Sequence, residues 1–369
     1  MSKKLYLMGK SGAGKTAIGL AFSLLWKERG NKVGFFKPKT AGNSLQQNHD
    51  ADIMLFKQVL NMPWEPERMG PLSQESTYIF GQSDHSRLFV NKMVEVLDDC
   101  FKEISDNVDI TLIEGSSSPS ICFSISLDDF SLAKKWKCPV IYITSLRRDN
   151  DLDEILFYNN YIQAKGLYLI GNILNDVSPE KMDKVRNVYA PIMKEKGYTV
   201  LGIIPSNPLT SFPTVAEYQK ALQGEILTGE ENMGAIVEGI EIGAMTTEGA
   251  LRYLRRGLNK AVITGGDRSD MALCALESST SVLILTGGLY PDVRVISQAS
   301  EKGIPVILVH YDTYTAINML QGIAKQIRPD DTESINLIKN EVSRHCRWEK
   351  IDEEMHSYSI CTERKNNNS

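Results

Sequence analysis

The sequence predicts an α/β protein in which a doubly wound, mainly parallel sheet is followed by a second, smaller α/β domain. Short apolar runs rich in β-branched residues alternate with longer amphipathic segments along most of the chain. The same alternation begins again after Pro213. Apolar strands that alternate with helices are typical of parallel sheets covered by helices on both faces.

Two series of elements follow from this pattern. The first series has strands at 5–8, 32–36, 110–114, 140–144, 167–174 and 200–204, with helices at 16–29, 85–103, 152–165 and 179–196. The second series has strands at 236–242, 260–264, 281–285 and 305–309. The segment 221–233, rich in Gly, Glu and Asn, is the expected seam between the two domains. We therefore expect domains at 1–215 and 216–345, followed by a polar, frayed tail at 346–369.

Composition narrows the class of protein. The 369 residues are 42% hydrophobic and 24% charged, with a net charge of −5, so no basic surface for nucleic acid is expected. No apolar run approaches the about 20 residues that span a bilayer, and the start of the chain leaves no room for a signal peptide. The six cysteines are scattered, which indicates reduced thiols. We expect a cytoplasmic protein that binds neither nucleic acid nor membranes.

The first strand-to-helix turn carries a phosphate-binding motif. Residues 9–16 read GKSGAGKT and match the pattern G-x-x-x-x-G-K-[ST] between a predicted strand and a predicted helix. Glycines let backbone N–H groups surround phosphate oxygens, and the helix N-terminus favours their negative charge. Lys15 is expected to reach the β- and γ-phosphates, and the Thr16 hydroxyl to ligate Mg²⁺. The motif predicts a sheet of the P-loop NTPase type.

Other polar residues follow the remaining predicted strands, where ligands collect in doubly wound sheets. Glu114 ends a strand, where it can hold Mg²⁺ or cap the next helix. Lys37 is held on a stiff turn before a proline, either as a second cation at the γ-phosphate or as a solvated lysine. Asp50 or Asp52 offers a further metal carboxylate, and Asn175 reads a base edge or caps a helix.

These residues together resemble dethiobiotin synthetase over about the first 215 residues. The segments that carry the resemblance are 9–16, 36–38, 50–56, 113–115, 171–177 and 201–205. It implies Mg-ATP held through Lys15, Thr16, Asp52 and Glu114, with Lys37 assisting at the γ-phosphate. The nucleotide contacts that it implies are Gly9, Gly12, Ala13, Gly14, Lys15, Thr16, Ala17, Asn175 and Pro205.

Two departures from that family concern the acceptor side of the site. Lys10 stands where the family has threonine or a similar residue, and it matches the second, signature lysine of MinD-like ATPases, which reaches the nucleotide of a partner subunit. Ser116-Ser117-Ser118-Pro119 replaces the glycine-rich turn after the acidic residue. Lys10 therefore joins Lys15 and Lys37 as a candidate catalytic residue, and we expect a homodimer or higher homo-oligomer.

The second half resembles the DRTGG domain. Strands ending in Gly265-Gly266-Asp267-Arg268 and Gly287-Gly288 carry the resemblance, and polar groups also follow the strands that end near 243 and 310. The pattern predicts a glycine-lined pocket for a small molecule or a dimer contact. Arg268 either pairs with a phosphate or carboxylate, or forms an internal ion pair with Asp267.

The order of the two modules resembles the N-terminal part of long bacterial phosphate acetyltransferases, and we expect no transferase domain in this chain. Two functions are compatible with this organisation. The first is an ATP-binding regulatory or assembly protein, favoured by Lys10 and the second domain. The alternative is an ATP-dependent ligase or kinase that activates a small carboxylate, favoured by the segment 37–42, which includes Thr40-Ala41-Gly42.

Overall fold

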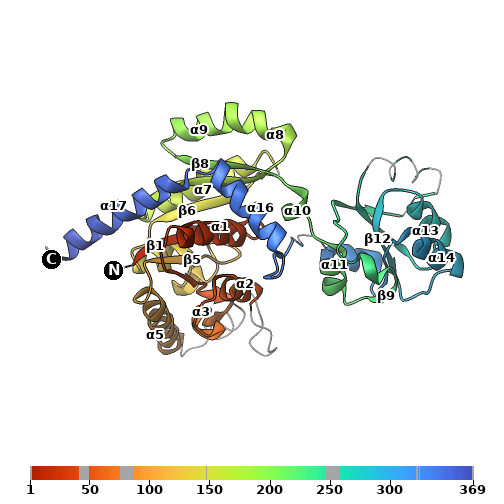
Figure 1. Cartoon of the computed structure of the whole chain (residues 1–369), viewed down its shortest axis with the longest axis horizontal. Coiled ribbons are helices and arrows are strands. Elements are labelled where there is room, and N and C mark those ends of the chain that lie inside the picture. The colour runs from red at the N-terminus through yellow and green to blue at the C-terminus, as the bar shows by residue number, and fades with distance from the viewer. Residues whose placement is uncertain are drawn as a thin grey trace. The chain divides into compact units, whose positions relative to one another are not determined.

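The computed structural model describes residues 2–40, 50–74, 86–146, 148–243, 257–320 and 325–367, together with residues 245, 246, 249, 252, 254 and 323. The chain divides into two compact units (Figure 1). The first comprises residues 1–206 and 327–369, and the second comprises residues 207–326. Ala41 and Gly42, which favour the ligase alternative above, lie outside the described residues.

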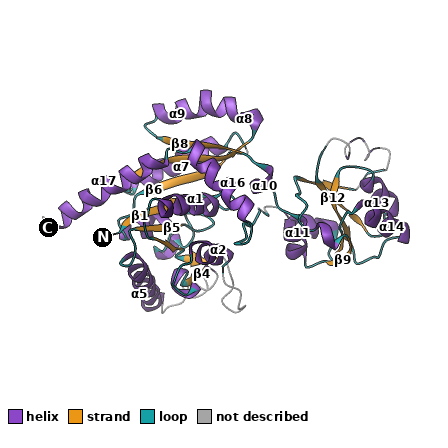
Figure 2. Cartoon of the chain, viewed as in Figure 1, coloured by secondary structure: helices purple, strands orange, loops and turns teal. Residues whose placement is uncertain are grey.

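The first unit is built on a parallel sheet with helices packed around it (Figure 2). The sheet has six strands in the order β2-β5-β1-β6-β7-β8. Its strands are β1 (Lys3–Met8), β2 (Val33–Phe36), β5 (Ile110–Glu114), β6 (Val140–Ser145), β7 (Leu169–Val177) and β8 (Val200–Pro205). Their apolar side chains are buried on both faces of the sheet, as the continuous apolar runs predict. The predicted fold class is confirmed.

The helices of this unit follow the strands in the predicted alternation. They are α1 (Lys15–Glu28), α2 (Ala51–Leu60), α3 (Pro66–Met69), α5 (Ser86–Ser105), α6 (Asp129–Lys135), α7 (Asp151–Ala164), α8 (Pro179–Lys184) and α9 (Ala190–Glu195). Two short strands, β3 (Lys39–Thr40) and β4 (Leu72–Ser73), form a separate parallel pair. Helix α1 lies directly on the sheet because Gly19 has no side chain: a Cβ there would lie 3.0 Å from Leu112 and 3.1 Å from Leu7.

The C-terminal residues correct the expectation of a frayed tail at 346–369. Helices α16 (Thr332–His345) and α17 (Trp348–Asn367) belong to the first unit, where α16 packs on α1 and β8 and α17 contacts β1 (Figure 1). Trp348, Ile351 and Met355 are buried in its core. These three residues lie three and four positions apart, so they share one helix face. The prediction of a frayed tail relied on the polar residues at the end of the sequence and overlooked this spacing.

The connection between these two helices is bound to the edge of the sheet. Cys346 forms an antiparallel bridge with Gly202 of β8, and the Arg347 N–H donates to the Leu201 carbonyl at 2.8 Å. A Cβ at Gly202 would lie 2.4 Å from the Cys346 Sγ, so the close approach needs a glycine. Backbone hydrogen bonds thus hold the C-terminal segment against β8.

The second unit has a five-stranded sheet with the order β10-β11-β12-β13-β9, in which β9 is antiparallel. Its strands are β9 (Glu225–Thr228), β10 (Gly239–Ile242), β11 (Lys260–Gly265), β12 (Thr280–Thr286) and β13 (Val306–Leu308). Its helices include α10 (Pro208–Ser211), α11 (Val215–Leu222), α13 (Ser269–Leu276), α14 (Val293–Lys302) and α15 (Thr313–Leu320). Alternate residues of β11 and β12 join two apolar clusters, so both faces of this sheet are covered.

The observed division differs from the expected domains at 1–215 and 216–345. The second unit begins at residue 207, and residues 327–345 return to the first. The expected seam at 221–233 contains β9, an edge strand of the second sheet. Its glycines and charges suit an exposed edge strand next to a turn, which composition does not distinguish from a linker. None of the described helices combines the length and apolar character that crossing a bilayer requires.

Candidate functional site

The predicted site residues of the first unit lie along one edge of its sheet, at the carboxyl ends of the strands. Because all six strands are parallel, the order of the sheet places these residues in sequence along the edge. Lys37 follows β2, Glu114 ends β5 and the loop 9–14 follows β1. Asn175 lies two residues before the end of β7, and Pro205 ends the neighbouring strand β8. Ligands of doubly wound sheets bind at this edge.

The loop after β1 has the backbone that its glycines predict. Gly9 and Gly14 have φ values of 156° and 91°, in the range that residues with a Cβ rarely adopt. A Cβ at Gly9 would also lie 2.3 Å from the Ile143 carbonyl oxygen, and one at Gly14 would lie 2.2 Å from the Asn175 amide nitrogen. Both glycines therefore allow the loop to lie tightly against the ends of β6 and β7.

Lys15 is the first residue of α1 and its side chain folds back across the loop. Its ammonium donates to the Gly9 carbonyl at 2.8 Å and to the Lys10 carbonyl at 3.0 Å. Burial lowers the pKa of Lys15, against the opposing effect of the nearby charge of Glu114. The geometry places the buried Lys15 ammonium within the loop, where it could contact a bound anion.

Lys37 and three carboxylates form a second cluster beside the loop. The Lys37 ammonium lies 3.0 Å from the Asp50 carboxylate and 3.4 Å from that of Glu114, and it also donates to Asp52. Burial alone would lower the pKa of Lys37, but the charges of Glu114, Asp52 and Asp50 outweigh it and raise that pKa. The Thr16 hydroxyl donates to Glu114 Oε1 at 3.2 Å, which joins this cluster to the loop.

Glu114 is the most buried member of the cluster. Burial raises the pKa of Glu114, although the charges of Lys37 and Lys15 act in the opposite direction. Its Oε2 atom is buried and has no hydrogen-bond partner among the described residues. An orphaned carboxylate oxygen beside a threonine hydroxyl is a donor set that suits a hard cation such as Mg²⁺.

The two aspartates occupy different positions on α2. Asp50 is the N-cap residue, and its Oδ1 accepts from the Asp52 N–H at 3.0 Å. Asp52 lies in the first turn, where its side chain is 30% exposed, against 6% for Asp50. The structure brings both of them to Lys37, so it does not separate the two candidates for the metal carboxylate.

The described residues contain no group of three or more His, Cys, Asp or Glu side chains with metal-binding geometry. Mg²⁺ in nucleotide sites is usually bound by one or two carboxylates, by waters and by substrate phosphates. Thr16, Asp52 and Glu114 would hold the ion, and the ion would neutralise phosphate charge when bound.

Asn175 contacts the loop directly. Its amide nitrogen donates to the Ala13 carbonyl at 3.0 Å, so Asn175 supports the loop. Its contact with a nucleotide base stays a prediction. Pro205 pairs with Val177, and the Ser206 N–H donates to the Val177 carbonyl at 2.8 Å. The two predicted nucleotide contacts, Asn175 and Pro205, therefore lie near the ends of neighbouring strands.

Lys10 points from the loop to α7. Its ammonium forms an ion pair with Glu154 Oε2 at 2.5 Å and lies 5.9 Å from the centre of the Tyr158 ring. The Lys10 side chain remains 47% exposed. Glu154 is a partner that sequence reasoning did not identify, because 144 residues separate the two.

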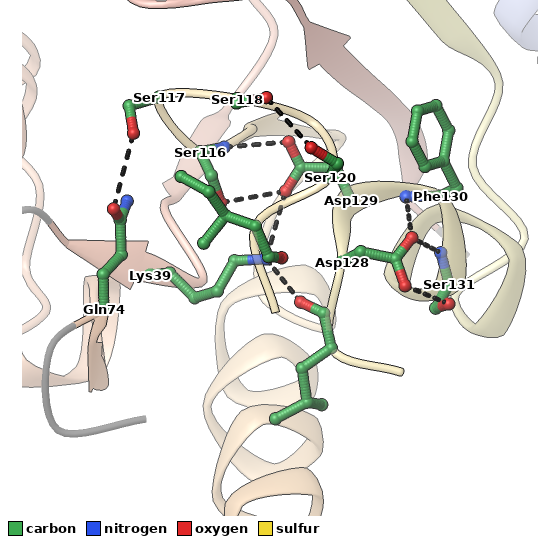
Figure 3. Close-up of polar contacts among 12 residues, drawn as sticks. Lys39, Gln74, Ser116, Ser117, Ser118, Ser120, Asp128, Asp129, Phe130 and Ser131 are labelled. Carbon is green, nitrogen blue, oxygen red and sulfur yellow. Dashed lines mark hydrogen bonds and ion pairs between the residues drawn. The ribbon is translucent and has the colours of Figure 1, made fainter. Parts of the chain in front are cut away.

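The serine turn after Glu114 is held by a buried aspartate (Figure 3). Asp129 accepts from the Ser116 N–H at 2.9 Å, from the Ser116 hydroxyl at 3.1 Å and from the Tyr6 hydroxyl at 3.1 Å. It also forms an ion pair with Lys39 at 3.2 Å, and both side chains are fully buried. The Ser117 carbonyl in turn accepts from the Ser11 N–H at 2.6 Å, so the turn and the phosphate loop are linked.

We expect Asp129→Asn to lower the free energy of unfolding by about 3–5 kcal/mol, because Lys39 would remain as an uncompensated buried charge. Urea unfolding followed by circular dichroism measures the loss. The matched control is Glu103→Gln, which removes the exposed pair with Arg68 at 2.7 Å and is expected to cost less than about 1 kcal/mol. Equal losses for the two variants would contradict the structural role given to the buried pair.

In the second unit, the side chain of Arg268 is bound by groups of the same domain. Arg268 pairs with Asp270 at 3.0 Å and donates to the Met245 carbonyl at 3.2 Å, so the internal ion pair is present, with Asp270 in place of Asp267. Gly266 is needed for close packing: a Cβ there would lie 1.8 Å from the Leu289 carbonyl oxygen. The glycine turns therefore bring the ends of β11 and β12 together.

Fold and site together define a P-loop NTPase-type domain joined to a second α/β unit. Residues 3–214, which are more than half of the chain, match the AAA domain. Residues 217–323 match the DRTGG domain. The chain belongs to the AAA domain family. The sequence resemblance to a P-loop module followed by a DRTGG module is confirmed.

The curated relatives agree with this organisation. Phosphate acetyltransferase of Nitratidesulfovibrio vulgaris is 26% identical over 365 residues, which covers 94% of this chain and 50% of the relative. The chain thus spans about half the length of such relatives. ATP-dependent dethiobiotin synthetase of Bacillus cereus is 23% identical over 192 residues, which covers 52% of this chain and 78% of the relative. Among solved structures, septum site-determining protein MinD with Mg-ADP from Pyrococcus horikoshii is 16% identical with a TM-score of 0.32, covering 57% of this chain and 84% of that one.

Sequence reasoning missed Lys39 and Asp129 as residues that organise the site. A local signal for α6 was present: Asp128 precedes apolar residues at helical spacing, and in the structure its carboxylate accepts from the Phe130 and Ser131 N–H groups, each at 3.1 Å (Figure 3). The pairing of Asp129 with Lys39 has no such local signal, because 90 residues separate them.

Proposed function

We propose that this chain is a Mg-ATP-binding regulatory or assembly protein, related to the regulatory half of phosphate acetyltransferase. The observation that carries the proposal is the convergence at one sheet edge of the Lys15 loop, the Thr16–Glu114 hydrogen bond and the Lys37 cluster. A buried cation, a hydroxyl and a carboxylate at a helix N-terminus are the groups that bind phosphate with Mg²⁺.

The roles in the site follow from these contacts. Lys15 would bind the β- and γ-phosphates, Thr16, Asp52 and Glu114 would hold Mg²⁺, and Lys37 would stabilise charge at the γ-phosphate. The remaining nucleotide contacts would come from the loop and from the ends of the last two strands: Gly9, Gly12, Ala13, Gly14, Ala17, Asn175 and Pro205.

A regulatory role is supported by the second unit. Large apolar side chains are exposed in the segments that follow the parallel strands β10, β12 and β13 and at the end of β10 itself: Ile242, Met245, Leu289, Tyr290, Tyr311 and Tyr314. Exposed apolar side chains that gather at one sheet edge are typical of binding or assembly surfaces. We propose that this edge of the DRTGG domain takes a small-molecule ligand or forms a homo-oligomer contact.

A ligase or kinase of small carboxylates is the second candidate, and one observation favours it. The Ser117 hydroxyl donates to Gln74 at 3.4 Å, and the Ser118 and Ser120 hydroxyls lie 3.2 Å apart on the same turn (Figure 3). Hydroxyl and amide groups next to a phosphate loop could bind an acceptor carboxylate. This candidate would use Lys37 and the serine turn as its acceptor site.

Measurements of ADP release and of dimerisation distinguish the regulator from the ligase or kinase. For the regulator, we expect wild-type protein to dimerise with Mg-ATP in sedimentation velocity, and ADP release to remain unchanged by pooled small carboxylates. Lys10→Ala should keep its ATP affinity within about threefold, about 0.6 kcal/mol, yet lose the association. Lys194→Ala, an exposed lysine on α9, is the matched control and should behave as wild type.

One outcome would contradict the regulator, and a second would contradict the role given to Lys10. Strong stimulation of ADP release by one acid would establish the ligase or kinase instead. Unchanged sedimentation of Lys10→Ala would exclude a role for this lysine across a dimer.

A further inference from the structure

The Lys37 ammonium lies among the carboxylates that the proposed function assigns to the metal. It is within ion-pair distance of Asp50, Asp52 and Glu114, and its side chain is only 8% exposed. These carboxylates come from two separate places, the start of α2 (its N-cap and first turn) and the end of β5. Lys37 is the cation that joins them.

Lys37 and a metal ion would share the same carboxylate group, that of Glu114. Glu114 Oε1 accepts from Thr16 at 3.2 Å and lies 3.4 Å from the Lys37 ammonium. The other oxygen of Glu114 is buried and has no partner among the described residues. An ammonium and a divalent cation at one carboxylate, with little water between them, repel each other strongly.

We propose that Lys37 serves as the internal counter-cation of these carboxylates and is exchanged for Mg²⁺ when Mg-ATP binds. This inference rests on the proposed function, and it assigns a regulation to that same site. Mg²⁺ alone has to displace an ammonium that would then lose its three partners in a buried place, which is unfavourable. When nucleotide is present, phosphate oxygens supply new counter-charge for the displaced lysine. Metal and nucleotide should therefore bind together.

The exchange also explains why a lysine is held so firmly at the carboxyl end of β2. Without a cation, the carboxylates of Asp50, Asp52 and Glu114 would repel one another, and those of Asp50 and Glu114 are buried. Lys37 compensates for these charges while no metal is bound. The chain thus keeps the carboxylates assembled before the ligand arrives.

Mn²⁺ binding without nucleotide tests the exchange, with free Mn²⁺ measured by electron paramagnetic resonance. Lys37→Met keeps an unbranched apolar side chain but removes the charge, and it should bind Mn²⁺ at least about tenfold more tightly than wild type. Lys37→Arg keeps a positive charge and should bind Mn²⁺ as weakly as wild type. Lys194→Met is the matched control at an exposed lysine and should not differ from wild type.

A second measurement uses wild-type protein and a non-hydrolysable ATP analogue. The analogue should raise the Mn²⁺ affinity of wild type at least about tenfold more than it raises that of Lys37→Met. If Lys37→Met does not fold, judged by circular dichroism, Lys37→Gln takes its place in both measurements.

Specific outcomes overturn the inference. If wild type and the uncharged variant bind Mn²⁺ with the same affinity in the absence of nucleotide, Lys37 does not compete with the metal. In that case nucleotide binding by wild type would leave the proposed function standing. Failure of wild type to bind the analogue at any Mn²⁺ concentration would instead overturn the proposed function, and the exchange with it.

Discussion

Replacing Lys15 with alanine is expected to abolish Mg-ATP binding measured by isothermal titration calorimetry. The Lys15 ammonium is buried and donates to two carbonyls of the loop, so it is held where phosphate oxygens would replace those acceptors. Hydrogen bonds to charged groups are worth about 1.5–3 kcal/mol each, and losing two of them lowers affinity by roughly a hundredfold or more. Such a loss moves binding outside the range of the measurement.

The control for this prediction is the fold of the variant. Lys15→Ala should keep the circular dichroism spectrum of wild type, because the two hydrogen bonds of the ammonium to described residues go to loop carbonyls. Lys194→Ala should bind Mg-ATP as wild type does. Intact binding by Lys15→Ala would show that the nucleotide site is not at this loop.

Ending the chain at residue 345 is expected to prevent stable folding of the first unit. The truncation removes Trp348, Ile351 and Met355, all buried in the core that β1 and α1 share. A large buried apolar side chain contributes about 1.5–3 kcal/mol, so the three together contribute about 5–9 kcal/mol. That is comparable with the about 5–15 kcal/mol by which a whole domain is stable.

Thermal unfolding and the yield of soluble protein measure this effect. A chain ending at residue 361 keeps all three side chains and serves as the matched truncation, with a midpoint near that of the full chain. The single variants Ile351→Ala and Glu353→Ala provide the same contrast within α17, because Ile351 is buried and Glu353 is exposed. A chain ending at 345 that melts with the full chain would contradict the assignment of α17 to the core.

Much of the fold could be predicted because its signals are local. The apolar runs at 110–114 and 140–144 are strands in the structure, and the motif at 9–16 stands between a strand and a helix as expected. Sequence reasoning failed where an apolar stripe was short and mixed with charges. Helices α16 and α17 have that character, and their place beside β1 and β8 depends on contacts with residues far away in the chain.

Some features of the candidate site could likewise be predicted from the sequence, and others could not. The motif identified Lys15 and Thr16 because the loop, strand and helix that define it are contiguous. Lys37 and Glu114 were identified as strand-end residues, but their direct contact was not, since it requires β2 and β5 to be neighbours in the sheet. Strand order is a property of the tertiary structure and cannot be derived from periodicity.

The sequence alone determined that this protein has a P-loop NTPase-type domain followed by a DRTGG domain, because each motif depends on residues close together in the chain. Only the tertiary structure decided which charges meet. It paired Lys10 with Glu154, Lys39 with Asp129, and Lys37 with the proposed metal carboxylates. Buried charges must find partners of opposite sign, and the packing of distant segments selects those partners.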